Sequence, residues 1–260
     1  MNSKATGKRI TQQQRKSLTL DQAIKNVVNY YAFFQYPALF EEVYRFLPTK
    51  SSKKELERAL SNLVALKKVI KHGNMAGNET RYAIPPYRIN NYVITEKRAD
   101  AQAKRIYIRQ YIAILKILPC IQLVGLSGSC AMEWCTKDED IDLIVIAQKG
   151  RMWSARFYCL LIATIMGMRR KRGSVYAPNK VCLNMFFDES NLLISKYKQN
   201  IYTAHEVLQM KPLFTKSDTY DRFLKANQWV FEYFPNVENV SLGGNVTTAK
   251  TRKDPRHRLL

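Results

Sequence analysis

Two aspartates placed two residues apart, Asp140 and Asp142, are the residues of this chain best suited to carry out chemistry. They lie at the start of an apolar run that ends at Ala147, and alternation along a strand puts both side chains on one face. Two neighbouring carboxylates repel each other unless a cation lies between them. The favoured cation is Mg²⁺, which proteins hold through one or two carboxylates together with substrate phosphates.

A Gly-Ser pair, Gly128 and Ser129, follows an earlier apolar run, and Ser129 precedes Asp140 by eleven positions. A helix that begins at such a pair directs free backbone N–H groups and the positive end of its dipole at an anion. The pair therefore predicts a phosphate-binding turn beside the two aspartates.

The pattern of a Gly-Ser pair followed by Asp-x-Asp resembles the nucleotidyltransferase superfamily typified by DNA polymerase beta. Gly128, Ser129, Asp140 and Asp142 match its signature position by position. The resemblance implies that the aspartates ligate two Mg²⁺ ions, while the Gly-Ser pair holds the triphosphate of a nucleoside triphosphate. The same residues also fit a second interpretation, a charged hairpin end beside a buried parallel strand.

In that superfamily a third carboxylate on a later strand completes the metal site, and the matching segment here is VCLNMFFDES. In a regular strand the residues that share one face are Cys182, Asn184, Phe186 and Asp188. Asp188 is our candidate for the third catalytic carboxylate, although it also suits a turn at the strand end. Asn184 is the alternative occupant, and a neutral amide is a poorer Mg²⁺ ligand.

The net charge of +21 implies a polyanionic partner, and we expect DNA or RNA, although a solubilising surface is the alternative. We assign Lys180 to nucleotide binding. The candidate nucleic-acid contacts are Lys71, Arg81, Arg169, Arg170, Lys171 and Arg172. The last four also fit a solvated loop.

Composition narrows the class of protein further. A hydrophobic content of 46% is typical of a globular chain. The five cysteines lack a CxxC pair, which favours reduced thiols in a cytoplasmic protein. The longest apolar run, 157–168, is too short to cross a bilayer, so we expect no membrane partner. His205 has no second histidine at i+4 and fits a structural role, and Trp153 fits a core position.

The N-terminal third of the chain predicts a winged helix-turn-helix domain over 18–86, after a basic disordered tail at 1–17. Apolar periodicity predicts helices at 18–34 and 39–46, and Ser51 or Ser52 with Glu55 predicts a capping box for a third. Leu56, Leu60, Leu63, Val64 and Leu66 form its predicted buried face. Two β-like runs, 69–71 and 81–84, form the expected wing, from which Lys71 and Arg81 would reach phosphate.

The remainder predicts a nucleotidyltransferase domain over 91–236, with a leading helix at 91–118 and a basic disordered tail at 237–260. The leading helix turns Ile106, Ile108, Ile112, Ile114 and Leu115 inward. Strands are predicted at 121–126, 141–147 and 181–187, and helices at 151–168, 203–210 and 220–233. The predicted fold class is α/β (α+β), with a small mixed sheet and flanking helices. Segments within 18–236 also resemble a poorly characterised bacterial group that joins a winged helix to a nucleotidyltransferase domain.

Two functions follow as hypotheses. The first is a Mg²⁺-dependent enzyme that moves a nucleoside monophosphate to an acceptor, with the winged helix and basic surface engaging nucleic acid or acceptor. The second is a nucleic-acid-binding winged-helix regulator whose transferase-like domain senses a nucleotide. The residue that completes the Asp140 and Asp142 cluster distinguishes them.

Overall fold

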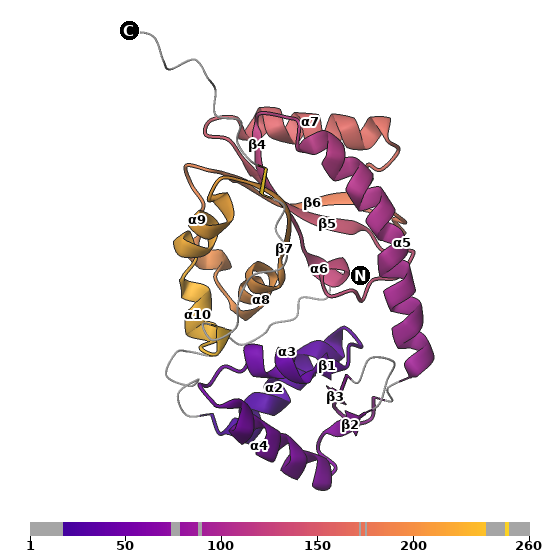
Figure 1. Cartoon of the computed structure of the whole chain (residues 1–260), viewed down its shortest axis with the longest axis vertical. Helices are drawn as coiled ribbons and strands as arrows, with labels where there is room; N and C mark the ends of the chain where they lie inside the picture. Colours follow the sequence, from indigo (N-terminus) through magenta and orange to yellow (C-terminus); the bar gives the residue numbers. More distant parts are fainter. Residues whose placement is uncertain are drawn as a thin grey trace. The chain divides into compact units, whose positions relative to one another are not determined.

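The computed structural model describes residues 18–73, 79–87, 90–171, 173–174, 176–237 and 248–249, which form a mixed α/β protein (Figure 1). The chain forms two compact units. The first unit comprises Met1–Asn91, Tyr197–His205 and Trp229–Leu242, and the second comprises Tyr92–Lys196, Glu206–Gln228 and Gly243–Leu260. The predicted tails, 1–17 and 237–260, lie outside the described residues except for Val237 and residues 248–249.

The first unit contains α2 (Leu20–Phe33), α3 (Phe40–Arg45) and α4 (Lys53–Ala65), together with a small antiparallel sheet. Its strands are β1 (Ala38–Leu39), β2 (Ile70–His72) and β3 (Arg81–Ala83), in the order β1-β3-β2. The predicted hairpin is confirmed as β2 paired with β3. Strand β1 was not predicted, because two residues between helices carry no periodic signal. Helix α10 (Trp229–Tyr233) also belongs to this unit.

Helix α4 shows how local chemistry sets the start and end of an element. Ser52 is its N-cap, and the reciprocal bonds between Ser52 and Glu55 form the predicted capping box. The predicted face is confirmed at Leu56, Leu60 and Leu63, which are buried. Leu66 is 60% exposed, so its assignment to that face is wrong. It occupies the C-cap, where the chain has already left the helical repeat.

The second unit is built on a mixed five-stranded sheet in the order β6-β5-β4-β7-β8. Its strands are β4 (Ile121–Leu126), β5 (Ile141–Ala147), β6 (Val181–Asp188), β7 (Lys211–Lys216) and β8 (Thr248–Ala249). Strand β5 runs antiparallel to β4 and parallel to β6. The predicted bounds of β4 and β5 are confirmed, whereas β7 was missed because its segment opens with Lys211-Pro212.

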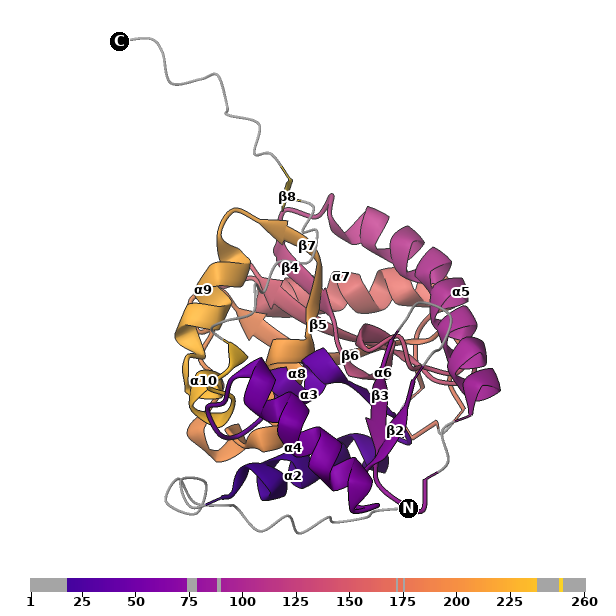
Figure 2. The same ribbon diagram turned by 60° about the horizontal axis from the view of Figure 1, so that its bottom comes forward.

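Helices α5 (Asn91–Leu115) and α7 (Met152–Ile165) share one buried core with the sheet. The Tyr111 hydroxyl donates to the carbonyl of Cys159, 2.7 Å away, and so joins the two helices. Helix α9 (Thr219–Ala226) lies on the opposite side of the sheet from α5 in both views (Figures 1 and 2). Alternate residues of β5, Ile141, Leu143 and Val145, enter the core beneath α5 and α7, so Asp142 points to the other face.

Helix α7 turns its small side chains to the sheet. Ala155, Cys159 and Ala163 are buried at four-residue intervals, whereas Trp153 is 75% exposed. The core assignment of Trp153 is therefore wrong. The helix is apolar on all sides, and periodicity alone does not tell which face packs closely. On α5, the predicted inward positions Ile106 and Ile114 are likewise exposed.

The pairing of β5 with β6 changes register once. Asp142 pairs with Cys182 and Leu143 with Leu183, but Ile144 pairs with Met185, which leaves Asn184 as an extra residue. An extra residue in one strand reverses the alternation of side chains beyond it. On the face of the sheet that carries Asp142, β6 therefore contributes Cys182 before the bulge and Met185 and Phe187 after it.

The remaining described helices are short: α6 (Gly128–Ala131), a 3₁₀ turn (Lys196–Lys198) and α8 (Ile201–Gln209). The helix predicted at 220–233 is instead divided into α9 and α10. Asn227 ends α9, and its side-chain amide donates to the carbonyls of Leu192 and Phe223. Within the described part of the chain, every helix is too short or too polar to span a lipid bilayer.

Candidate metal and phosphate site

The turn from β4 into α6 is packed directly against Asp142. Gly128 has a φ of +65°, and a Cβ at this position would lie 2.5 Å from the Asp142 Oδ2 atom. The Ser127 backbone N–H donates to the carbonyl of Asp142, 2.9 Å away. Glycine is therefore required both by the left-handed backbone and by the close approach of the carboxylate.

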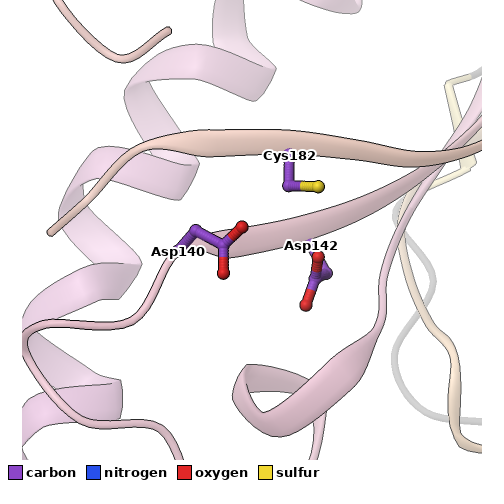
Figure 3. A group of neighbouring side chains, drawn as sticks. All are labelled: Asp140, Asp142 and Cys182. Carbon is purple, nitrogen blue, oxygen red and sulfur yellow. The ribbon is translucent and has the colours of Figure 1, made fainter. Parts of the chain in front are cut away.

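Asp140, Asp142 and Cys182 form a cluster (Figure 3). Asp140 directly precedes β5, Asp142 lies on β5, and Cys182 lies on the neighbouring strand β6. Their ligand atoms, one from each side chain, all lie within 4.8 Å of one another, and each residue is half-buried. The two aspartates predicted as metal ligands are thus adjacent, as the alternation argument requires. Cys182 comes from β6, at the position that pairs with Asp142.

The electrostatics of the cluster favour a cation. Burial and the neighbouring charge of Asp140 raise the pKa of Asp142 to about 6. Burial and the charge of Asp142 raise the pKa of the Cys182 thiol to about 11. Both shifts reflect negative charge held away from water, which a bound cation would offset.

Arg170 supplies a positive charge to this cluster. Its Nη1 group donates to Asp140 Oδ2, and its Nη2 group donates to the carbonyl of Ser174 at 3.1 Å. The preceding backbone is fixed to β6, because the Val181 N–H donates to the carbonyl of Met168 at 2.7 Å. The sequence named Arg170 as a nucleic-acid contact, but in the structure its partner is a carboxylate.

Ser129 is engaged by a residue between the two motifs. Its hydroxyl donates to Glu139 Oε2 at 2.5 Å. Glu139 thereby fixes the side chain that the sequence assigned to the triphosphate, and a phosphate group at Ser129 would have to replace this bond.

Asp188 is not near the aspartate pair, so its prediction as the third catalytic carboxylate is wrong. It pairs with Ala147, ~20 Å along β6 from Cys182 at the usual rise of a strand. Its carboxylate accepts hydrogen bonds from the Gly150 N–H at 2.7 Å and the Ser190 N–H at 2.9 Å. Asp188 also lies on the opposite face of the sheet from Asp142, because beyond the bulge at Asn184 the residues that share the face of Asp142 are odd-numbered.

Asn184 and Glu206 contact each other, and Glu206 lies close enough to Asp142 to affect its ionisation. The Asn184 amide donates to Glu206 Oε1 over 3.5 Å, and the charge of Glu206 contributes to raising the pKa of Asp142. Burial raises the pKa of Glu206 itself. Glu206 is not among the site residues predicted from the sequence. The available signal was a carboxylate among apolar residues of α8.

The other predicted basic contacts in the second unit are Lys180, Arg169, Lys171 and Arg172. The Lys180 ammonium donates to the carbonyl of Gly167 at 2.6 Å, which explains its position without a nucleotide. Arg169 and Lys171 are exposed. Arg172 lies outside the described residues.

In the first unit the two predicted phosphate contacts differ. Lys71 is exposed on β2. Arg81 is only 2% exposed, donates to the carbonyl of Pro37 at 2.9 Å and forms an ion pair with Glu79. Its assignment as a nucleic-acid contact is therefore wrong, because its charge is already used in a buried structural role.

His205 is a buried core residue of the first unit, as its isolation in the sequence indicated. Its ring stacks on Tyr30 at a centroid distance of 3.8 Å and on Phe46 at 4.3 Å. Burial holds the pKa of His205 well below its usual value, so the ring is neutral.

Comparison with known proteins adds no family assignment: no protein-family model, curated protein or solved structure matches this chain. The geometry of the site is therefore the basis for assigning a function.

Proposed function

We propose that the second unit is a Mg²⁺-dependent nucleotidyltransferase domain, which moves a nucleoside monophosphate from a nucleoside triphosphate to an acceptor. The observation that carries the proposal is the packing of a Gly-Ser turn against a pair of carboxylates. The Asp142 carboxylate occupies the space that a Cβ at Gly128 would need, and Asp140 directly precedes the strand of Asp142. A small-residue turn beside two acidic groups suits a metal-bound triphosphate.

The oxygen donors of the cluster fit one divalent cation. Asp140 and Asp142 supply hard carboxylate ligands, whereas the thiol of Cys182 is a poor ligand for Mg²⁺. When bound, Mg²⁺ would neutralise triphosphate charge and acidify the acceptor hydroxyl. A second ion, as the superfamily resemblance implies, would need another oxygen ligand, and Glu206 is the nearby carboxylate we assign to it.

The chain's own residues would divide the work of transfer. Asp140 and Asp142 would hold the cation beside the reacting phosphate, and the turn at Gly128 and Ser129 would orient the triphosphate. Such positioning and charge stabilisation supply most of the catalysis in phosphoryl-type transfer, because the protein forms no covalent bond with the substrate.

We further propose that the first unit is a winged helix-turn-helix module that engages nucleic acid or the acceptor. The supporting observation is its element order, α2-β1-α3-α4-β2-β3, with the three strands in one antiparallel sheet. In that arrangement α4 and the β2–β3 hairpin are the contact elements, and Lys71 is the exposed basic residue on the hairpin. The net charge of +21 favours a polyanionic partner.

The test of the enzyme is label transfer. Full-length protein is incubated with Mg²⁺, each α-labelled nucleoside triphosphate and bulk RNA or DNA, and pyrophosphate release is followed in parallel. We expect turnover with at least one triphosphate, lost in Asp140→Ala and Asp142→Ala and kept in Asp188→Ala, which changes an acid at the far end of β6. Turnover that survives both first variants would refute the assignment of the site.

One observation favours a second function, nucleotide sensing without turnover. Cys182 occupies the position beside Asp142 where a third carboxylate would complete the metal site. A sensor would bind a triphosphate with Mg²⁺ in equilibrium dialysis, release no pyrophosphate, and change the affinity of the first unit for nucleic acid. The same variants at Asp140 and Asp142 would abolish that binding.

A further inference from the structure

The guanidinium of Arg170 is bonded to one carboxylate oxygen of Asp140, a member of the candidate metal-binding cluster. It donates to Asp140 Oδ2, and the two side chains are 36% and 17% exposed, so water screens this pair only in part. Its other end is attached to the carbonyl of Ser174. Arg170 thus offsets the repulsion between two neighbouring carboxylates, which is also what a cation would do.

We propose that Arg170 is an internal counterion that competes with the divalent cation for Asp140, and that cation binding releases the guanidinium to the triphosphate. The inference rests on the proposed function, because it assumes that the cation and triphosphate occupy this site. It adds a step that regulates the site: Arg170 stabilises the two neighbouring carboxylates until a cation replaces it.

The competition follows from charge. A guanidinium and a divalent cation on the same carboxylate repel each other at short range, and the repulsion is largest where side chains are partly removed from water. Metal binding to the wild-type protein therefore carries the cost of displacing Arg170 from Asp140. A variant without the positive charge should bind the metal more tightly, whereas a merely structural arginine would give unchanged or weaker binding.

The release step follows from the shape of the guanidinium. Its planar donors match two oxygens of a phosphate as well as they match a carboxylate. The carbonyl of Ser174 keeps the side chain near the site when Asp140 is taken by the cation. Arg170 would then contribute to triphosphate affinity only after the cation is bound.

The first experiment titrates the full chain with Mn²⁺ and follows free Mn²⁺ by electron paramagnetic resonance, without nucleotide. Arg170→Gln removes the charge and keeps an amide donor for the carbonyl of Ser174. We expect its Mn²⁺ affinity to rise about tenfold, a typical size for coupling between two ligands. The matched control is Arg169→Gln, which removes the same charge from the exposed neighbouring residue and should change affinity less than about twofold.

The second experiment measures binding of inorganic triphosphate at saturating Mn²⁺ by calorimetry. Arg170→Gln should weaken it about tenfold through loss of a charge-assisted contact, while Arg169→Gln should not. Arg170→Lys keeps the charge and should retain the low Mn²⁺ affinity of the wild type. Circular dichroism and thermal unfolding check that each variant is folded.

Two kinds of failure are distinguishable. Equal or weaker Mn²⁺ binding in folded Arg170→Gln, with binding still lost in Asp142→Asn, would overturn the competition and leave the metal site standing. Mn²⁺ binding that is absent throughout, or insensitive to Asp142→Asn, would overturn the metal site and this inference together.

Discussion

The two ends of strand β6, marked by Cys182 and Asp188, have different roles. At one end Cys182 lies beside Asp142 and Asp140, with their ligand atoms within 4.8 Å of one another. At the other end Asp188 accepts hydrogen bonds from Gly150 and Ser190 and holds a turn. Asn184, the extra residue of the bulge, separates the two ends. An acidic residue on the expected strand is therefore not enough to complete a site, because the register decides which face it occupies.

The two ends also differ in how they treat negative charge. Burial and Asp140 raise the pKa of Asp142 to about 6. Although burial acts upward on Asp188 too, hydrogen bonds from Ser190 and Gly150 bring the pKa of that carboxyl below its usual value. At the first end a bound cation would reduce the repulsion between the Asp140 and Asp142 carboxylates. At the second end backbone N–H groups already stabilise the Asp188 carboxylate.

The largest expected effect compares alanine substitutions at two glycines, one near each end of β6, that have nearly equal φ angles. Gly128 and Gly150 have φ values of +65° and +70°, so alanine costs ~1–2 kcal/mol of backbone strain at each. At Gly128 the new Cβ would also strike Asp142 Oδ2, whereas at Gly150 it meets nothing within 4 Å. We expect Gly128→Ala to reduce nucleotidyl transfer or nucleotide binding ~100-fold or more. Gly150→Ala should leave both within about threefold.

Chemical denaturation and label-transfer assays on both variants provide the measurement. Equal loss of function in the two would mean that backbone strain, and not the contact with Asp142, is responsible.

The next effect is a pH dependence of stability with opposite sign at the two ends. A carboxyl whose folded pKa is raised stabilises the fold below its unfolded pKa, and that stability is lost as pH rises through the folded pKa. For Asp142 the window runs from its ordinary value of 3.8 to about 6, and the loss is ~1–3 kcal/mol. Asp188 behaves oppositely, since its lowered pKa gives stability that is lost as pH falls below the ordinary value.

Urea unfolding of the metal-free protein between pH 3 and 8 tests both signs, with a neutral variant at each end as the comparison. Asp142→Asn should remove the loss between about pH 4 and 6, and Asp188→Asn should reduce the loss below about pH 4. A stability curve that Asp142→Asn leaves unchanged would contradict the raised pKa.

A smaller effect follows from giving the Cys182 end the acid that it lacks. Cys182→Asp places a third carboxylate beside Asp142 and should tighten Mg²⁺ binding about tenfold, because Mg²⁺ prefers oxygen ligands. Cys182→Ser, which adds oxygen without charge, should change binding by less than about threefold. Magnesium titration by calorimetry measures both. Equal affinity in the two variants would show that Cys182 lies outside the coordination sphere.

The smallest effect is expected at the residue that separates the ends. Asn184 is exposed and makes one long contact of 3.5 Å with Glu206, so Asn184→Ala should change the unfolding free energy by less than about 0.5 kcal/mol. The role of Asn184 is to provide the extra backbone residue of the bulge, and alanine keeps that residue. Thermal unfolding and Mn²⁺ titration of this variant should match the wild type, and a large change in either would mean that the side chain supports the site.

Much of the fold could be predicted where the signal is local. The apolar runs of β4 and β5 gave the observed bounds, and Ser52 with Glu55 gave a capping box. These features depend on residues close in sequence, whose hydrogen bonds and alternation are fixed by backbone geometry. The adjacency of Asp140 and Asp142 is of the same kind.

The misassigned residues depend on packing between distant segments. Arg81 has the composition of a phosphate contact, but the carbonyl of Pro37 and the charge of Glu79 hold it inside the first unit. Trp153 has the composition of a core residue, but Ala155 and Cys159 bring the opposite face of α7 to the sheet. Each of these side chains suits both a buried and an exposed position, and residues distant in sequence determine which of the two it occupies.

By itself, the sequence determined the carboxylate pair and the Gly-Ser turn that approaches it, because alternation and turn chemistry act over a few residues. Only the tertiary structure decided what completes the cluster. The pairing of β6 with β5 places Cys182 beside Asp142, the bulge at Asn184 puts Asp188 on the opposite face, and the loop after α7 brings Arg170 to Asp140. Strand register and loop position are set by packing and hydrogen bonding over the whole sheet, so no local pattern records them.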